Sequence, residues 1–361
     1  MKILFAFFLI LHGLIHLLGF VKTQSISVTP AFNGAATVWI IICTMFLLSA
    51  FGYFSNKDLW WILAVVSVIL SQILIIFYWK EAKWGTIANI GVIVVAIVSF
   101  AGWNFNRHVK SEAKALLSLT AIDKKILTED MLSGLPPPVQ LWLNHAGAVG
   151  KEMTSTVRLK QNGLMRMSPD QKNWVETNAE QYFTINQPAF IWKVKINMMS
   201  FIPVVGKDEW IDGRGQMNIR VFSLYNMVNQ AGFKIDQGAM QRWLAEIVWF
   251  PSAALSSFIK WEAINSLSAK ATISYKGVSG SVVFHFSEQG DVMSCSADRY
   301  MGGGKDAKPE TWEVHSKKFS IVHHIRIPVK SEATWKLSSG DFTWYKLQIT
   351  DIDYNEPFIY N

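Results

Sequence analysis

The chain has 361 residues, 50 % of them hydrophobic, and a formal net charge of +7. Up to Trp103 it contains five Lys, no Arg and two acidic residues, which leaves the longer remainder nearly balanced in charge. No basic stripe or RNA-binding motif is present, which excludes a typical nucleic-acid-binding protein. Cys43 and Cys295 are the two cysteines, so a disulfide framework is excluded as well.

Four apolar runs fill the first part of the sequence, at residues 3–20, 35–54, 59–78 and 85–103. Each has about the twenty residues that a helix needs to cross a bilayer, and none contains Asp, Glu, Lys or Arg. Tryptophans near their ends suit the membrane interface. The sequence therefore predicts a domain of four transmembrane helices over residues 1–104, with the lipid bilayer as its partner.

The first run starts with a basic residue, as signal peptides do. It has no small-residue cleavage site and three further spans follow, so we expect a retained helix. If the N-terminus is cytoplasmic, five basic residues flank the cytoplasmic side and three flank the other side, which favours a bacterial inner-membrane protein with a cytoplasmic C-terminal domain. The five are Lys2, Lys57, Arg107, Lys110 and Lys114, and the three are Lys22, Lys80 and Lys83.

Polar side chains occur at a similar depth in all four runs. His12 and His16 share one helical face, and Cys43, Ser71 and Asn89 are at comparable depth in the other runs. Hydrogen bonds between helices explain such a layer. A metal or haem site at His12 and His16, or a quinone-linked pocket, is the alternative interpretation, because imidazole and thiolate are good metal ligands. The sequence identifies no particular cofactor.

The charged residues after Trp103 predict a helical linker over residues 105–134. Gly134 and three prolines in "LSGLPPPVQLWLNHAG" then break the chain, and Pro138 suits the first turn of a short helix. We expect the C-terminal domain to begin here and to cover residues 135–361.

From Glu152 to Tyr354 the hydrophobic pattern has period two, which is typical of antiparallel strands with one buried face. The fold class predicted is an α+β domain with a curved, mostly antiparallel sheet and a few packed helices. The alternating segments are residues 154–161, 190–198, 216–224, 271–277, 281–300, 317–327, 332–337 and 341–352.

One segment, residues 236–261, interrupts the strands with apolar residues at helical spacing. Asp236 is a candidate N-cap, and Pro251 is expected to end or kink the helix before a second short one. A helix with this apolar stripe should lie against the curved sheet.

The sequence has no nucleophile elbow, zinc-protease motif, P-loop, dinucleotide fingerprint or C-x-x-C pair, so it favours a non-enzymatic function. The glycine run in "YMGGGKDAKPE" lacks the spacing of a phosphate loop and is expected to be a flexible hairpin connection. His323 and His324 fall in a strand-like run, where their rings would point to opposite faces. Glu262 and Asp298 are the remaining acids considered for a hydrolase.

Large aromatic side chains are frequent in the C-terminal domain. They pack a core, or they line an apolar cavity between the sheet and its helix. Glu246 lies among them and is expected either to pair with Arg242 or Arg299, or to anchor a ligand in such a cavity. The candidate ligand-binding residues are Trp192, Trp243, Glu246, Trp249, Trp261 and Arg299.

The stretches "LPPPVQLWL", "QRWLAEIVWFPSAAL", "ADRY" and "IRIPVKSEATWKLSSGDFTWYKLQITDIDY" resemble an uncharacterised bacterial family of unknown function, over roughly residues 130–355. This resemblance implies a β-rich domain and transfers no catalytic residues. The inferred shape is similar to half-barrel lipoprotein carriers by analogy of fold. The function favoured is binding of an apolar or amphipathic, lipid-like ligand near the membrane, with an oligomeric state that the sequence leaves open.

Overall fold

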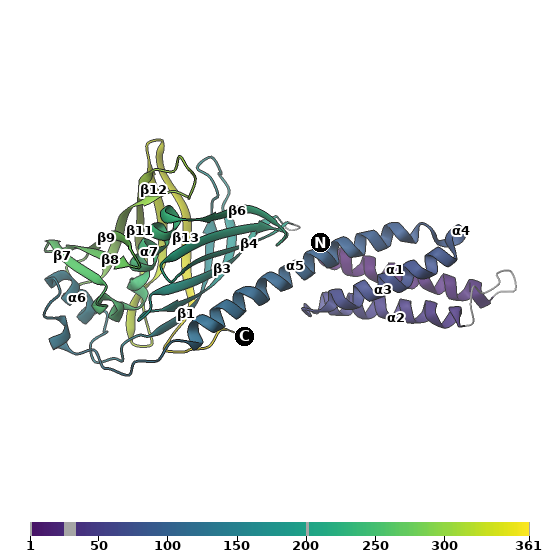
Figure 1. The fold of residues 1–361 in the computed structure, drawn as a ribbon, viewed down its shortest axis with the longest axis horizontal. Coiled ribbons are helices and arrows are strands. Elements are labelled where there is room, and N and C mark those ends of the chain that lie inside the picture. Colours follow the sequence, from purple (N-terminus) through teal and green to yellow (C-terminus); the bar gives the residue numbers. More distant parts are fainter. Residues whose placement is uncertain (1, 25–33, 200–201, 361) are drawn as a thin grey trace. The chain divides into compact units, whose positions relative to one another are not determined.

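The computed structural model describes residues 2–24, 34–199 and 202–360 (Figure 1). The chain divides into two compact units, Met1–Arg107 with Phe222–Leu224, and His108–Val221 with Tyr225–Asn361. We call the first the helical unit and the second the sheet domain.

Among the residues that the structure describes, four helices are long and apolar enough to cross a membrane, in agreement with the four apolar runs of the sequence. A short helix, α4, follows α3 before the last of the four begins. The bounds are α1 (Lys2–Gln24), α2 (Ala35–Phe54), α3 (Trp60–Phe77), α4 (Trp79–Ala82) and α5 (Gly85–Ser118). α5 continues well beyond its apolar part, because the charged residues after Trp103 keep the helical pattern.

Polar side chains of α1, α3 and α5 form a hydrogen-bonded network inside the helical unit. His12 Nε2 donates to Asn89 Oδ1 at 2.8 Å, and Asn89 Nδ2 donates to Ser71 Oγ and to Gln72 Oε1, each at 3.1 Å. Ser71 Oγ also lies 2.8 Å from His16 Nε2. The predicted hydrogen bonds between helices are thereby confirmed for these residues, all of which except Gln72 are fully buried.

α2 contributes rings rather than hydrogen bonds to this network. The Phe46 ring lies 4.7 Å from the His12 ring and 5.3 Å from the His16 ring, and Trp39 lies 5.5 Å from His16. Thr44 donates to Ile40 O within its own helix. The polar layer is therefore closed on its α2 side by aromatic packing.

The sheet domain contains one antiparallel sheet of thirteen strands, in the order β6-β5-β4-β3-β2-β1-β13-β12-β11-β10-β9-β8-β7. Figure 1 shows it curved into a half-barrel. The strands are β1 (Thr156–Met165), β2 (Val175–Thr184), β3 (Ala189–Met199), β4 (Ile202–Ile211), β5 (Arg214–Val221), β6 (Tyr225–Ala231), β7 (Ile259–Asn265), β8 (Ser268–Tyr275), β9 (Val278–Phe286), β10 (Val292–Tyr300), β11 (Pro309–Val322), β12 (Ile325–Leu337) and β13 (Gly340–Tyr354).

The strand order describes two meanders that meet at one place. β1 to β6 run outward in sequence, β7 to β13 run back, and β13 pairs with β1. Side chains alternate between the two faces: Val157, Leu159 and Gln161 of β1 are buried, whereas Arg158 and Lys160 are half-buried on the convex face. The expected curved antiparallel sheet is confirmed.

α7 (Phe233–Glu246) connects the two meanders and lies on the concave face of the sheet (Figure 1). It packs against β4, β5, β8, β9 and β10, and its core-facing residues are almost entirely buried. Short 3₁₀ turns at Ile247–Trp249 and Pro251–Leu255 follow it, because Pro251 cannot continue the α-helix.

Three details differ from the sequence analysis. Asp236 is not the N-cap of α7, since the helix starts at Phe233 and Asp236 Oδ1 accepts from Gly215 N at 2.7 Å. His323 and His324 are not in a strand but form the turn between β11 and β12, both with positive φ. Trp261 lies on β7, because the chain returns to the sheet after the 3₁₀ turns.

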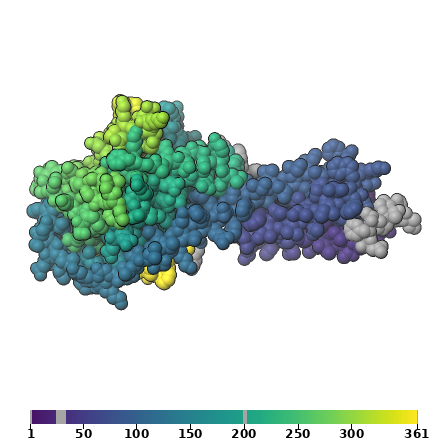
Figure 2. Space-filling view, in the orientation of Figure 1, coloured from purple at the N-terminus to yellow at the C-terminus, as the bar shows by residue number. Residues whose placement is uncertain are grey.

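The segment that precedes β1 lies along the edge of the sheet domain, where Figure 2 shows it in blue. It contains a 3₁₀ turn at Glu129–Leu132 and α6 (Pro137–His145). Trp142 of α6 packs on Phe284 of β9 with ring centroids 6.2 Å apart. The expected break at the prolines is thus the start of α6, with Pro137 and Pro138 at its first positions.

Replacement of Asn89 by leucine should lower the stability of the helical unit. The substitution keeps the side chain's size and removes three interhelical hydrogen bonds, each of which contributes about 0.6 kcal/mol within a membrane. We expect the free energy of unfolding to fall by about 1–2 kcal/mol in a denaturing-detergent titration. Thr44→Val, which removes a bond within one helix, is the matched control; an equal loss in both variants would contradict the prediction.

Candidate functional site

The concave face of the sheet domain contains a cavity of about 260 Å³. α7 forms one wall, and strands from both meanders form the others. Most of its lining is aromatic or aliphatic, which is typical of sites for apolar ligands. The tryptophans that line it are Trp192, Trp249, Trp312, Trp335 and Trp344.

A chain of buried hydrogen bonds crosses one side of the cavity. Trp192 Nε1 donates to Gln161 Oε1 at 3.1 Å, and Gln161 Nε2 lies 3.4 Å from Gln181 Oε1. Gln181 Nε2 then donates to Glu246 Oε2 at 2.8 Å. Each polar group in this chain has a partner, as buried amides require.

The series of hydrogen bonds ends at Arg242 of α7, which lies between two carboxylates. It donates to Glu246 Oε1 at 2.9 Å and to Asp208 Oδ2 at 2.6 Å. Its guanidinium also lies over the rings of Phe190 and Trp192, at 4.9 and 4.8 Å. Burial opposes the charge of Arg242, but the two carboxylates outweigh it and raise its pKa. Burial raises the pKa of Glu246 although Arg242 opposes that shift.

Arg299 extends from β10 to α7 and is bound differently. Its Nε donates to Gly238 O at 2.8 Å, and its guanidinium stacks on the ring of Trp312 at 4.8 Å. Within the described part of the chain, Arg299 forms no ion pair with a carboxylate. Burial lowers the pKa of Arg299 to about 10, so the side chain remains a cation at neutral pH.

Glycine at position 238 leaves room for Arg299 against α7. A Cβ atom added at Gly238 would lie 3.3 Å from Arg299 Nε, which is closer than most side chains allow. Gly238 therefore lets the guanidinium lie directly on the backbone of α7, where the carbonyl oxygen accepts its hydrogen bond.

The structure brings together four of the six residues proposed for ligand binding. Trp192, Glu246, Trp249 and Arg299 line the cavity. Trp243 instead packs in the core against Trp210 and Phe250, and Trp261 packs on Trp142 and Phe284. The expected pairing of Glu246 with Arg242 is confirmed, and Arg299 is not part of that pair.

Several lining residues were missed in the sequence. Asp208 and Gln161 lie at inward positions of their strands, where the alternation predicts apolar residues. The available signal was a polar residue at a position where the period-two pattern predicts a buried apolar one. Trp312, Trp335 and Tyr345 gave none, because an aromatic residue facing a cavity has the same pattern as one facing a filled core.

The loop between β10 and β11 lies where the cavity meets the surface. Of the lining residues that the structure describes, Met301 of this loop is the exposed one, at 38 %. Lys234, at the start of α7, donates to Gly304 O, Lys305 O and Ala307 O, each at 2.9 Å. The glycine run is thus a hairpin connection, as expected, and one ammonium group holds it at the mouth of the cavity.

The histidines of the helical unit lie in the hydrogen-bonded network described above. Both ring nitrogens of His16 are engaged, Nδ1 with His12 O and Nε2 with Ser71 Oγ. Over residues 2–24, 34–199 and 202–360, no group of three His, Cys, Asp or Glu side chains is placed to hold a metal ion.

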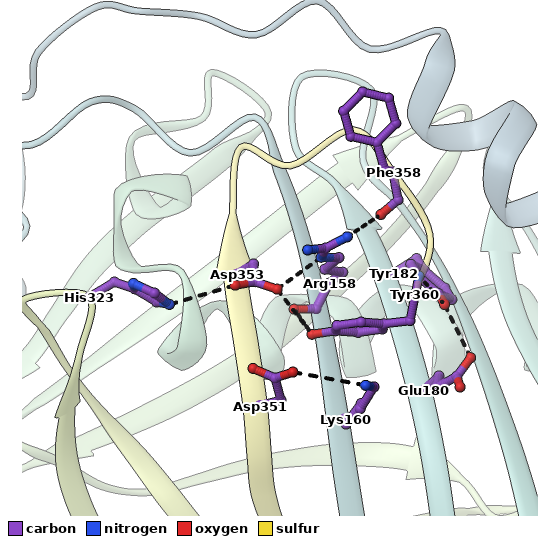
Figure 3. Close-up of polar contacts among 9 residues, drawn as sticks. All are labelled: Arg158, Lys160, Glu180, Tyr182, His323, Asp351, Asp353, Phe358 and Tyr360. Carbon is purple, nitrogen blue, oxygen red and sulfur yellow. Dashed lines mark hydrogen bonds and ion pairs between the residues drawn. The ribbon is translucent and has the colours of Figure 1, made fainter.

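A second polar cluster lies on the convex face, where the C-terminal segment folds back over β1 and β13 (Figure 3). The Tyr360 ring lies between Lys160, at 4.1 Å, and Arg158, at 4.7 Å. Arg158 Nε donates to Asp353 Oδ2 at 2.9 Å, and its NH1 donates to Phe358 O at 3.1 Å. These groups satisfy one another, so the cluster attaches the C-terminal segment to the sheet.

The fold and cavity define a type of chain in which a half-barrel domain follows four helices long and apolar enough to cross a membrane. Within that class, the chain belongs to a family of unknown function, DUF6544, whose model matches residues 125–347. The resemblance inferred from the sequence is thereby confirmed. Among curated proteins, none matches the sequence.

Two solved structures are similar in shape to part of the chain. A LolA superfamily protein from Nitrosomonas europaea has 11 % identity and a TM-score of 0.33, over 60 % of this chain and 94 % of that one. A DUF1329 family protein from Desulfovibrio piger has 6 % identity and a TM-score of 0.36, over 60 % of this chain and 92 % of that one. Both are distant likenesses.

Replacement of Lys234 by methionine should open the mouth of the cavity. The variant keeps most of the side-chain volume and removes the ammonium group that three loop carbonyls share. Cys295 lines the cavity, and burial raises its pKa to about 12, so it reports access by its slow reaction with a neutral disulfide reagent. In a Cys43→Ser background we expect labelling of Cys295 to accelerate several-fold.

Lys308→Met is the matched control, because Lys308 is an exposed residue of the same loop and its loss removes the same charge. Both variants should keep the wild-type melting temperature. Equal labelling rates in the two variants would show that Lys234 does not hold the loop.

Replacement of Tyr360 by alanine should destabilise the sheet domain. It removes two cation–π contacts and the burial of one ring, for a loss of about 2 kcal/mol in the free energy of unfolding. Urea unfolding followed by tryptophan fluorescence measures it. Phe358→Ala, at a side chain 66 % exposed, should change that free energy by less than about 0.5 kcal/mol. The prediction fails if the two losses are equal.

Proposed function

We propose that the sheet domain binds an apolar or amphipathic, lipid-like molecule in the cavity beneath α7, and that the protein acts as a binding protein rather than an enzyme. The observation that carries this proposal is the cavity itself, whose walls are mainly indole rings and aliphatic side chains. Trp192 and Trp249 form part of the apolar lining, and Glu246 and Arg299 supply polar groups beside it.

The lining suits binding more than bond cleavage. Each oxygen of Glu246 accepts a hydrogen bond from a side chain, Oε2 from Gln181 and Oε1 from Arg242, so this carboxylate is held as part of the wall. Cys295 stays a thiol, since burial raises its pKa to about 12. A nucleophile paired with a base, the usual mark of covalent catalysis, does not occur among the lining residues that the structure describes.

The volume limits the size of the ligand. About 260 Å³ lies just under the range of about 300–1,000 Å³ typical of small-molecule sites. One aliphatic chain suits this space better than a two-chain phospholipid. The four apolar helices would keep the domain beside a bilayer, which is the source of such molecules.

We further propose that the helical unit lies in a bacterial inner membrane with both termini in the cytoplasm. The support is the excess of basic residues in the flanks assigned to that side, five against three. A reporter enzyme that is active only in the periplasm, fused after the C-terminus, should be inactive. Periplasmic activity of that fusion would overturn the orientation.

Filling the cavity should abolish co-purification of a ligand. Ala333 lines the cavity, and Ala333→Phe would occupy part of its volume. We expect mass spectrometry of organic extracts to find a single-chain lipid in molar proportion to the wild-type full-length protein and strongly reduced amounts in this variant. Ala263→Phe, at an exposed position on β7, is the control and should retain the lipid. The same lipid content in wild type and both variants would overturn the proposal.

A further inference from the structure

The charged residues of the cavity lining are not balanced. The lining contains three cationic side chains, Lys234, Arg242 and Arg299, and two acidic ones, Asp208 and Glu246. Charges are costly in an apolar surrounding unless they are paired. The ammonium of Lys234 already binds three loop carbonyls, so Arg299 is the cation that an anionic ligand would complement.

The two acids are already committed to one cation. Arg242 binds Glu246 at 2.9 Å and Asp208 at 2.6 Å, with the second oxygen of Glu246 held by Gln181. This triad forms a closed set of charge-assisted hydrogen bonds. It therefore fixes the wall of the cavity and has little capacity left for a ligand.

Arg299 has the capacity that the triad lacks. Only its Nε donates a hydrogen bond to the described residues, so its two terminal amino groups remain as donors at the cavity wall. A guanidinium that presents parallel N–H groups matches a carboxylate or a phosphate in a bidentate geometry. Stacking on Trp312 holds its plane in place for such a partner.

Arg299 also lies near the mouth of the cavity, where the charged head group of an amphiphile would remain close to water. It precedes Tyr300 and Met301, which lead to the exposed mouth, and it contacts α7 at Gly238. From Gly238 to Val248 the helical segment extends over about 15 Å and lines the cavity along its length. A head group at Arg299 would thus direct its chain toward Trp249.

We propose that the ligand is an anionic single-chain amphiphile whose carboxylate or phosphate binds Arg299 while its chain lies along α7. This inference rests on the proposed lipid-binding function and adds the charge of the ligand and its orientation. Arg299 is the residue that selects the head group, and the Arg242 triad is part of the wall.

Calorimetry of the full-length protein in an amphipol tests the head group with probes of one chain length. We expect decanoate to bind at least tenfold more tightly than 1-decanol, and decylammonium more weakly than either, because a second cation would face Arg299. Acetate, at the same concentration as decanoate, should not bind, which distinguishes a free anion from an anion attached to a chain.

Arg299→Met should weaken decanoate binding by about 10- to 100-fold and leave decanol binding unchanged, because it removes a charge-assisted hydrogen bond and keeps the apolar stem. Arg299→Lys should retain part of the preference for decanoate, which guards against a loss caused by misfolding. Arg214→Met, at a side chain 83 % exposed, is the matched control and should bind decanoate as the wild type does.

The outcomes separate the two proposals. If decanol binds as tightly as decanoate, or if Arg299→Met binds decanoate as the wild type does, the head-group inference is wrong and the lipid-binding function stands. If no probe binds, the lipid-binding function is wrong and the inference falls with it. Binding of acetate as tight as that of decanoate would identify an anion site without a chain.

Discussion

The sheet domain depends on the burial of α7 against the concave face of the sheet. A thirteen-stranded half-barrel has two open edges, β6 and β7, and an apolar inner face that water would otherwise cover. α7 joins those two edges in the sequence and crosses the inner face in space, so one connection both completes the chain path and removes that face from water. α7 packs mainly on β4 to β6 and β8 to β10, toward the two edges, and the cavity lies between the helix and the central strands.

That arrangement also explains why charged residues occur inside the domain. α7 places Arg242 and Glu246 one turn apart, on the side that faces the strands, and β4 supplies Asp208. An ion pair in such a position contributes little net stability, because desolvation offsets the attraction, but loss of one partner is costly. The triad therefore joins α7 to β4, and Arg299 of β10 contacts the same helix one turn earlier, at Gly238, without a carboxylate at ion-pair distance among the described residues.

The sequence was sufficient for the fold class and for part of the site. The uncharged apolar runs predicted the four helices, and the period-two alternation predicted the strands. Both patterns can be recognised within a short stretch of sequence. The N-cap of the first helix in residues 236–261 was placed at Asp236, four residues after the observed N-cap Gly232. The carboxylate of Asp236 instead accepts a hydrogen bond from Gly215 of β5. Trp243 and Trp249 have the same local pattern, and only their tertiary neighbours separate a core residue from a lining residue.

The cavity draws its residues from both meanders, which pair with each other in the sheet through β1 and β13. The first meander contributes Trp192 and the polar chain through Gln161, and the second contributes Arg299 with the indoles that support it. These two sets of residues lie farther apart in the sequence than the length of a typical sequence motif. No short pattern could therefore have identified the site. A shift of register between β1 and β13 would move the polar chain through Gln161 relative to the second meander. That strand pair and the packing of α7 on both meanders together keep the two sides of the cavity in one geometry.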